Sequence, residues 1–67
     1  MIDITVNNEP YQFKEAVDLP VLLDQLKIPA KGIAIAINDV VVSRVNWKKT
    51  KVRDQDNILV IKAVQGG

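Results

Sequence analysis

The residues of this sequence that could take part in chemistry lie at its C-terminal end, Val64-Gln65-Gly66-Gly67. Glycine has no Cβ, so it can thread a narrow channel that other residues would block. Fully extended, residues 64–67 reach roughly 13 Å. We therefore expect the α-carboxylate of Gly67 to be the reacting group, activated inside the closed site of a partner enzyme. Gly66 would give clearance there, and Gln65 and Val64 would contact the partner.

The side chains, in contrast, offer little catalytic chemistry. The sequence has no His and no Cys, so it lacks the usual acid–base group and the thiol nucleophile. Its eight acidic residues are scattered, and none forms an evident carboxylate pair. We expect a partner or substrate of enzymes and not an enzyme, with no bound cofactor, disulfide or metal.

Length and composition indicate one small domain. With 67 residues, 48% of them hydrophobic, the chain must rely on a dense apolar core, because small domains bury a small share of their surface. A net charge of +1 gives no overall attraction to nucleic acid or membrane. We see no signal peptide and no apolar run long enough to cross a bilayer. We expect a cytoplasmic protein that is monomeric when free.

The first half of the chain predicts a hairpin followed by a helix. Alternating apolar residues predict a strand over Ile2–Val6, and Asn7-Asn8 suits a tight turn into an antiparallel strand with Pro10 on the sheet edge. Asp18 is a candidate N-cap, and Pro29 should end a helix of about three turns. The leucines that form its apolar face are Leu19, Leu22, Leu23 and Leu26.

The second half predicts three more strands. Ile33–Ile37 is expected near the sheet centre, with its isoleucines under the helix and Ala34 and Ala36 on the opposite face. After an Asn38-Asp39 turn we expect a short returning strand over residues 40–42. An irregular or briefly helical segment should follow over 43–50, and the last strand over 58–62. Depending on register, Ile58 and Val60 would join Ala34 and Ala36 in an exposed apolar patch that docks partner enzymes.

This order of elements predicts an α+β fold of the β-grasp, or ubiquitin-like, type. It has a mixed sheet of four to five strands with one main helix packed across one face. We expect the strand after the helix to run parallel to the first strand, and the final strand to lie beside the first. Residues 1–64 would form the domain, and residues 65–67 a flexible tail.

Several segments resemble the ThiS family of thiamine-biosynthesis sulfur carriers, and the resemblance covers essentially the whole chain. The segments are the leucine-rich helix Val21–Leu26, the strand Ala34–Asn38, the Arg-x-x-Trp segment Val42–Trp47, Asp54-x-Asp56, and the terminal Gly66-Gly67. The Arg44 and Trp47 pair favours the thiamine branch over the small subunit of molybdopterin synthase.

The resemblance implies a carrier cycle. A ThiF-like adenylating enzyme uses ATP to adenylate the Gly67 carboxylate, a sulfur-donor enzyme supplies sulfur to form a thiocarboxylate, and thiazole synthase consumes that sulfur. The alternatives are a carrier for molybdopterin synthesis or tRNA thiolation, a ubiquitin-like modifier, and a small RNA-binding or protein-binding β-grasp module.

Two features stay open at this point. Relatives place Gly where this chain has Gln55, and a non-glycine residue in the left-handed region costs roughly 1–2 kcal/mol, so either the turn differs or the strain is absorbed. The basic stretch Arg44–Arg53 is a solvated face, a docking patch for an acidic partner, or an RNA site with Trp47, Tyr11 or Phe13 stacking on bases. Nucleic acid is not an expected partner, since aromatic residues are few. Trp47 is expected to pack in the core or contact a partner.

Overall fold

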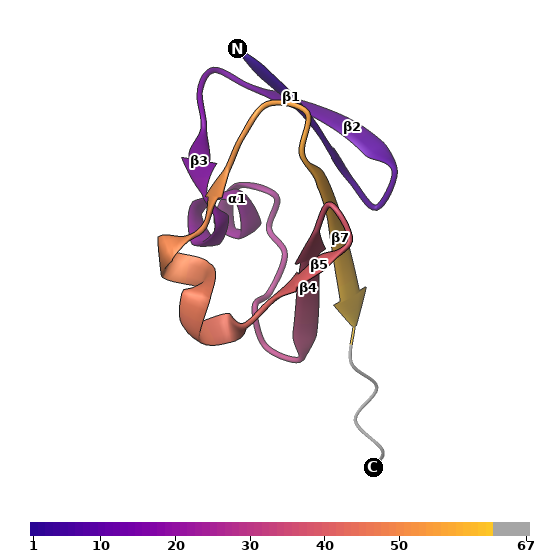
Figure 1. Ribbon diagram of the computed structural model, residues 1–67, viewed down its shortest axis with the longest axis vertical. Helices are drawn as coiled ribbons and strands as arrows, with labels where there is room; N and C mark the ends of the chain where they lie inside the picture. The colour runs from indigo at the N-terminus through magenta and orange to yellow at the C-terminus, as the bar shows by residue number, and fades with distance from the viewer. Residues whose placement is uncertain (63–67) are drawn as a thin grey trace.

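The structure is a computed structural model that describes residues 1–62 (Figure 1). It contains a five-stranded sheet, a two-stranded bridge, one α-helix and one 3₁₀ helix. Their bounds are β1 Ile2–Val6, β2 Glu9–Phe13, β3 Val17–Asp18, α1 Leu19–Gln25, β4 Ile33–Ile37, β5 Val40–Val42, η1 Arg44–Lys49, β6 Lys51–Val52 and β7 Asn57–Lys62.

Two tight hairpins form the outer parts of the sheet. β1 and β2 are joined by Asn7 and Asn8, with φ values of 51° and 69°, and β4 and β5 by Asn38 and Asp39, with φ values of 52° and 71°. Two central residues with positive φ are the mark of the turn that matches the twist of antiparallel strands, and Asn and Asp tolerate this conformation. Both predicted turns are therefore confirmed.

The last strand, β7, lies at the centre of the sheet, whose order is β2-β1-β7-β4-β5. It runs parallel to β1, as expected for a final strand beside the first, and antiparallel to β4. β4 consequently runs antiparallel to β1, and the prediction that these two strands are parallel is wrong. The right-handed crossover rule fixes the hand of a parallel connection and does not require that a connection be parallel.

Helix α1 is shorter than predicted, with seven residues and about two turns. Lys27 adopts a φ of 57°, its N–H donates to the Asp24 carbonyl at 3.1 Å, and the Ile28 N–H donates to the Leu23 carbonyl at 2.9 Å. These two bonds form a Schellman motif, which ends a helix by satisfying its last carbonyls. The helix therefore ends well before Pro29.

The core lies between α1 and one face of the sheet. Its fully buried side chains come from the helix, the adjacent sheet strands β4 and β7, and β6: Leu19, Leu22, Ile35, Val52 and Ile58. The β3–β6 bridge, which pairs Val17 with Val52, brings the chain after η1 against the start of the helix. A mixed five-stranded sheet with one main helix across one face is the β-grasp arrangement, as predicted.

Candidate functional site

The predicted reacting residue Gly67 and its neighbours Gly66, Gln65 and Val64 lie outside the described residues. The structure does fix the point from which they follow. β7 ends at Lys62, which lies opposite Ile33 at the end of the β4–β7 ladder. Any group carried on residue 67 is therefore attached to the central strand of the sheet.

The sheet face opposite α1 carries an apolar patch next to this point. Cross-strand pairs place Ala34 beside Ile61, and Ala36 beside both Leu59 and Val41. Leu59 and Ile61 are each 45% exposed and Val41 is 71% exposed, while Ala36 is buried between its larger neighbours. We call these five residues the outer apolar face. An exposed group of large apolar side chains is a common feature of protein-binding surfaces.

Two of the four residues predicted for this face point the other way. Ile58 is fully buried in the core, and Val60 is half-buried and packs against that core. The placement of Ile58 and Val60 on the exposed face is therefore wrong. Successive side chains of a strand alternate between faces, and the phase of β7 gives Leu59 and Ile61 to the outside. Ala34 and Ala36 lie on the predicted face.

Polar residues border the outer apolar face on the β1 side. The Thr5 hydroxyl donates to the Asn57 side-chain carbonyl at 2.8 Å, and the Gln12 amide donates to the Asp3 carboxylate at 2.8 Å. The apolar surface is thus confined to β7, β4 and β5, the half of the sheet that contains the end of β7.

The turn before β7 ties three separate segments together. Gln55 has a φ of 71°, so the turn adopts the left-handed conformation with a strained non-glycine residue. Its N–H donates to the Asp3 carbonyl at 2.7 Å, and the Asp3 N–H donates to Asp54 Oδ1 at 2.7 Å. Asp56 accepts from the Arg53 N–H at 2.8 Å and from the Asn38 amide at 3.0 Å. These bonds offset the strain and explain why the two aspartates are present.

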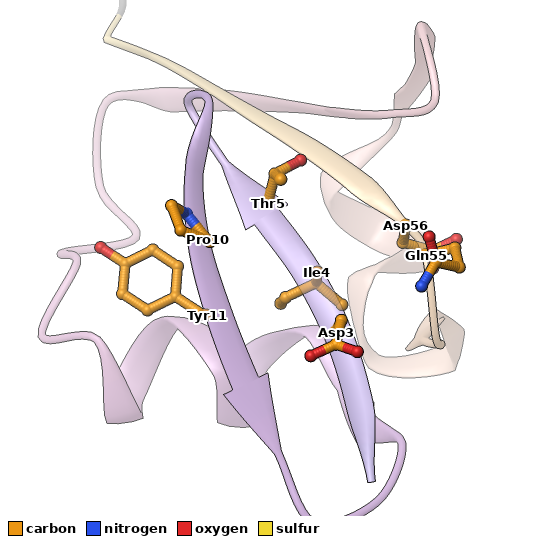
Figure 2. A pocket seen from close by; sticks show the side chains of 7 residues that line it. All are labelled: Asp3, Ile4, Thr5, Pro10, Tyr11, Gln55 and Asp56. Atoms are coloured by element: carbon orange, nitrogen blue, oxygen red, sulfur yellow. The ribbon is translucent and has the colours of Figure 1, made fainter.

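A shallow hollow between this turn and the first hairpin is drawn in Figure 2. Its lining includes the carboxylates of Asp3 and Asp56 together with Tyr11. Both carboxylates already accept hydrogen bonds that join strands or close the turn. Among residues 1–62, no three acidic side chains come close enough to hold a metal ion. The two carboxylates that line the hollow therefore have structural roles in the sheet and the turn.

Trp47 holds the 3₁₀ helix η1 against α1. The side chain is buried, and its Nε1–H donates to the Val42 carbonyl at 3.0 Å. The Arg44 guanidinium lies 4.6 Å from the centroid of the indole ring and donates to the Ala30 carbonyl at 2.7 Å. Core packing, one of the two roles expected for Trp47, is confirmed. The basic side chains of η1 that follow Trp47, Lys48 and Lys49, are exposed.

The sheet order and the one main helix among residues 1–62 place the protein among small ubiquitin-like β-grasp proteins. The model of the ThiS family matches residues 4–67, and the chain belongs to that family. Within the part of the chain that is described, neither helix is long and apolar enough to cross a membrane.

Individual proteins and a solved structure are similar to this chain over nearly its whole length. The sulfur carrier protein ThiS of Escherichia coli (strain K12) is 33% identical over 66 residues, which cover 98% of this chain and 100% of that protein. An uncharacterized protein of Pyropia yezoensis, ycf40, is 32% identical over 66 residues, covering 98% of this chain and 93% of its own length. The crystal structure of a thiamine biosynthesis protein, ThiS, from Geobacter metallireducens has a TM-score of 0.88 at 28% identity, covering 98% of this chain and 100% of that one.

Proposed function

We propose that this protein is a sulfur carrier of thiamine biosynthesis, with the Gly67 carboxylate as the carrier group. The observation that carries the proposal is the family match, which runs through to Gly67, together with full-length similarity to a sulfur carrier protein. The absence of Cys fits a carrier that holds sulfur on an acyl group. The protein itself is not an enzyme in this scheme.

The chemistry follows from the weakness of a carboxylate as an electrophile. A ThiF-like adenylating enzyme joins the Gly67 carboxylate to the AMP part of ATP and releases pyrophosphate. Hydrosulfide delivered by a sulfur-donor enzyme then attacks the acyl carbon, the bond from carbon to the AMP oxygen breaks, AMP leaves, and a thiocarboxylate forms. Thiazole synthase takes the sulfur, and the carboxylate returns for another cycle. Gly66 gives clearance in these sites, where Gln65 and Val64 contact the enzymes.

The outer apolar face docks these partner enzymes in the proposed cycle. Its position beside the end of β7 supports this role, because a partner bound there lies next to the residues that follow Lys62. Leu59→Glu and Ile61→Glu should abolish binding to the adenylating enzyme with the fold intact by circular dichroism. Val21→Glu is the matched control, because Val21 is exposed to a similar extent, 43%, and lies on the helix. Equal binding by all three variants would place the interface elsewhere.

The carrier role is tested by intact-protein mass spectrometry after incubation with ATP, the adenylating enzyme and a sulfur source. The expected product is heavier by the difference between sulfur and oxygen, and deletion of Gly67 should prevent its formation. Gly66→Val should fold normally and block adenylation, because a β-branched side chain would fill the narrow channel. Conjugates to lysines of other proteins would instead indicate a modifier. Normal adenylation of Gly66→Val would refute the argument from tail clearance.

A further inference from the structure

A groove with apolar walls lies on the helix side of the molecule, away from the outer apolar face. Its volume is about 320 Å³, and it is lined by Pro20, Leu23, Asp24, Ile28, Pro29, Ala30 and Trp47. In Figure 1 the segment that carries Trp47, the orange coil of η1, lies on the same side of the sheet as α1. We call this feature the helix-side groove.

The walls of the helix-side groove are held by specific bonds. The Schellman motif fixes the Ile28 backbone against Leu23 through the bond of 2.9 Å. Arg44 joins the opposite wall to the same loop, since it donates to the Ala30 carbonyl and covers the Trp47 ring. A groove that is already formed binds an apolar group at lower entropic cost than one that must be ordered first.

Most of the charged residues that flank the groove lining in the sequence are basic. Lys27 and Lys31 border the loop that lines it, Lys48 follows Trp47, and all three are exposed. Of the basic stretch Arg44–Arg53, Arg44 is held at the groove by its contacts with the Trp47 ring and the Ala30 carbonyl, whereas Lys51 pairs with Asp18 at 3.9 Å. Asp24 is the single acidic residue in the lining. A partner that covers the groove therefore gains most if it is acidic.

We propose that the helix-side groove binds an acidic segment of a partner protein. An apolar side chain of that segment enters the groove against Trp47 and Ile28, and carboxylates beside it meet Arg44, Lys48 and Lys31. This combination of an apolar anchor with a charged rim is the usual anatomy of a protein interface. The inference rests on the groove and its charges, and it stands whether or not the sulfur-carrier function holds.

Two other classes of partner fit the groove less well. Single-stranded RNA is held by bases stacked on open aromatic faces, but Trp47 is 6% exposed and Arg44 lies over its ring. The other aromatic residues, Tyr11 and Phe13, are on β2 and not in the groove. A membrane surface needs apolar side chains that project into it, whereas Leu23 and Trp47 are buried and Ile28 is only partly exposed.

Binding at this groove leaves the other surface free. The groove is built on the helix layer, and the outer apolar face is on the opposite side of the sheet. One partner can therefore hold the groove while another contacts the outer apolar face and the residues after Lys62. The groove would keep the protein attached to an acidic partner while its C-terminal residues are in use elsewhere.

The experiment is a titration of the full-length protein with a synthetic peptide of two leucines flanked on each side by two glutamates. A matched peptide has lysines in place of the glutamates. Trp47 is the only tryptophan, so its fluorescence reports on the groove directly, and amide NMR spectra locate the site. We expect the acidic peptide to change the Trp47 emission and to shift the amide signals of 23–31 and 44–49. Its affinity should fall as salt is added.

Charge variants at exposed positions separate specific binding from general attraction. Lys48→Glu should weaken binding of the acidic peptide about fivefold, and Asp24→Asn should tighten it about twofold. Lys14→Glu makes the same charge change at an exposed position outside the groove and should have much less effect. Equal losses for Lys48→Glu and Lys14→Glu, equal binding of the lysine peptide, or signals that move only outside the groove would overturn the proposal. So would tighter binding of oligouridylate, or of phosphatidylserine vesicles, at the same amides.

Discussion

Gln55, like Lys27, is a residue other than Gly, Asn or Asp in the left-handed region, and Gln55→Gly should stabilise the protein. A non-glycine residue in the left-handed region costs roughly 1–2 kcal/mol, and Gln55 has a φ of 71°. Glycine removes that cost but loses about 0.5–1 kcal/mol through greater freedom in the unfolded chain. The Gln55 side chain makes one bond, a long one of 3.4 Å to Asp54, so little is lost with it. The expected net gain in the free energy of unfolding is about 0.7 kcal/mol.

The assay is thermal and urea unfolding followed by circular dichroism. For a domain of this size the expected rise in Tm is about 4 °C. Gln55→Ala is the control, because alanine removes the same side-chain bond and keeps the Cβ that causes the strain. It should leave the free energy of unfolding nearly unchanged. If the glycine and alanine variants are equally stable, the strain assigned to this turn is wrong.

Two further predictions test the register of β7 and the role of Trp47. Ile58→Ala should lower the free energy of unfolding by about 2–5 kcal/mol, because Ile58 is fully buried. The adjacent Leu59→Ala should change it by less than about 1 kcal/mol. Urea unfolding of both variants measures the difference, and a larger loss for Leu59→Ala would refute the assigned faces of β7. Trp47→Phe should cost about 1–3 kcal/mol, since the Val42 carbonyl loses the Nε1–H donor; an unchanged urea midpoint would show that this bond contributes nothing.

The main features of the fold could be predicted because local patterns agree with the tertiary structure. Ile2, Ile4 and Val6 alternate with polar residues, and all three are buried as the pattern requires. The two Asn-containing turns supply the positive φ that hairpins need. The apolar face of α1 could be assigned because the spacing of its leucines matches the helical repeat.

The faces of β7 could not be predicted from its own residues. Ile58-Leu59-Val60-Ile61 is apolar throughout, so it contains no polar residue that would mark the outside. Its phase is set by pairing with β1 and β4, which lie far away in the sequence. The outer apolar face was therefore predicted with the wrong residues from β7.

The end of α1 and the bridge between β3 and β6 could not be predicted from the sequence, for different reasons. Glycine is the usual signal for the residue that ends a helix in the left-handed region, but this chain has Lys27 there. The bridge pairs only two residues on each strand, too few to produce a period in the sequence. The helix-side groove depends on the end of α1, because Ile28, which follows the turn at Lys27, lines one side of it and Trp47 of η1 lines another.

The central position of β7 has a consequence for how the protein is made. β7 is the last of the described elements to leave the ribosome, yet it joins the hairpin of β1 and β2 to the hairpin of β4 and β5. Until β7 is synthesised, the two hairpins have no strand between them. The pairing of β7 with β1 then joins residues more than 50 positions apart in the sequence, as the Thr5–Asn57 pair shows. Non-local pairing of this kind slows folding. A nascent chain therefore completes its sheet only after β7 has been synthesised, so in the proposed cycle the partner enzymes meet the residues that follow Lys62 on a finished domain.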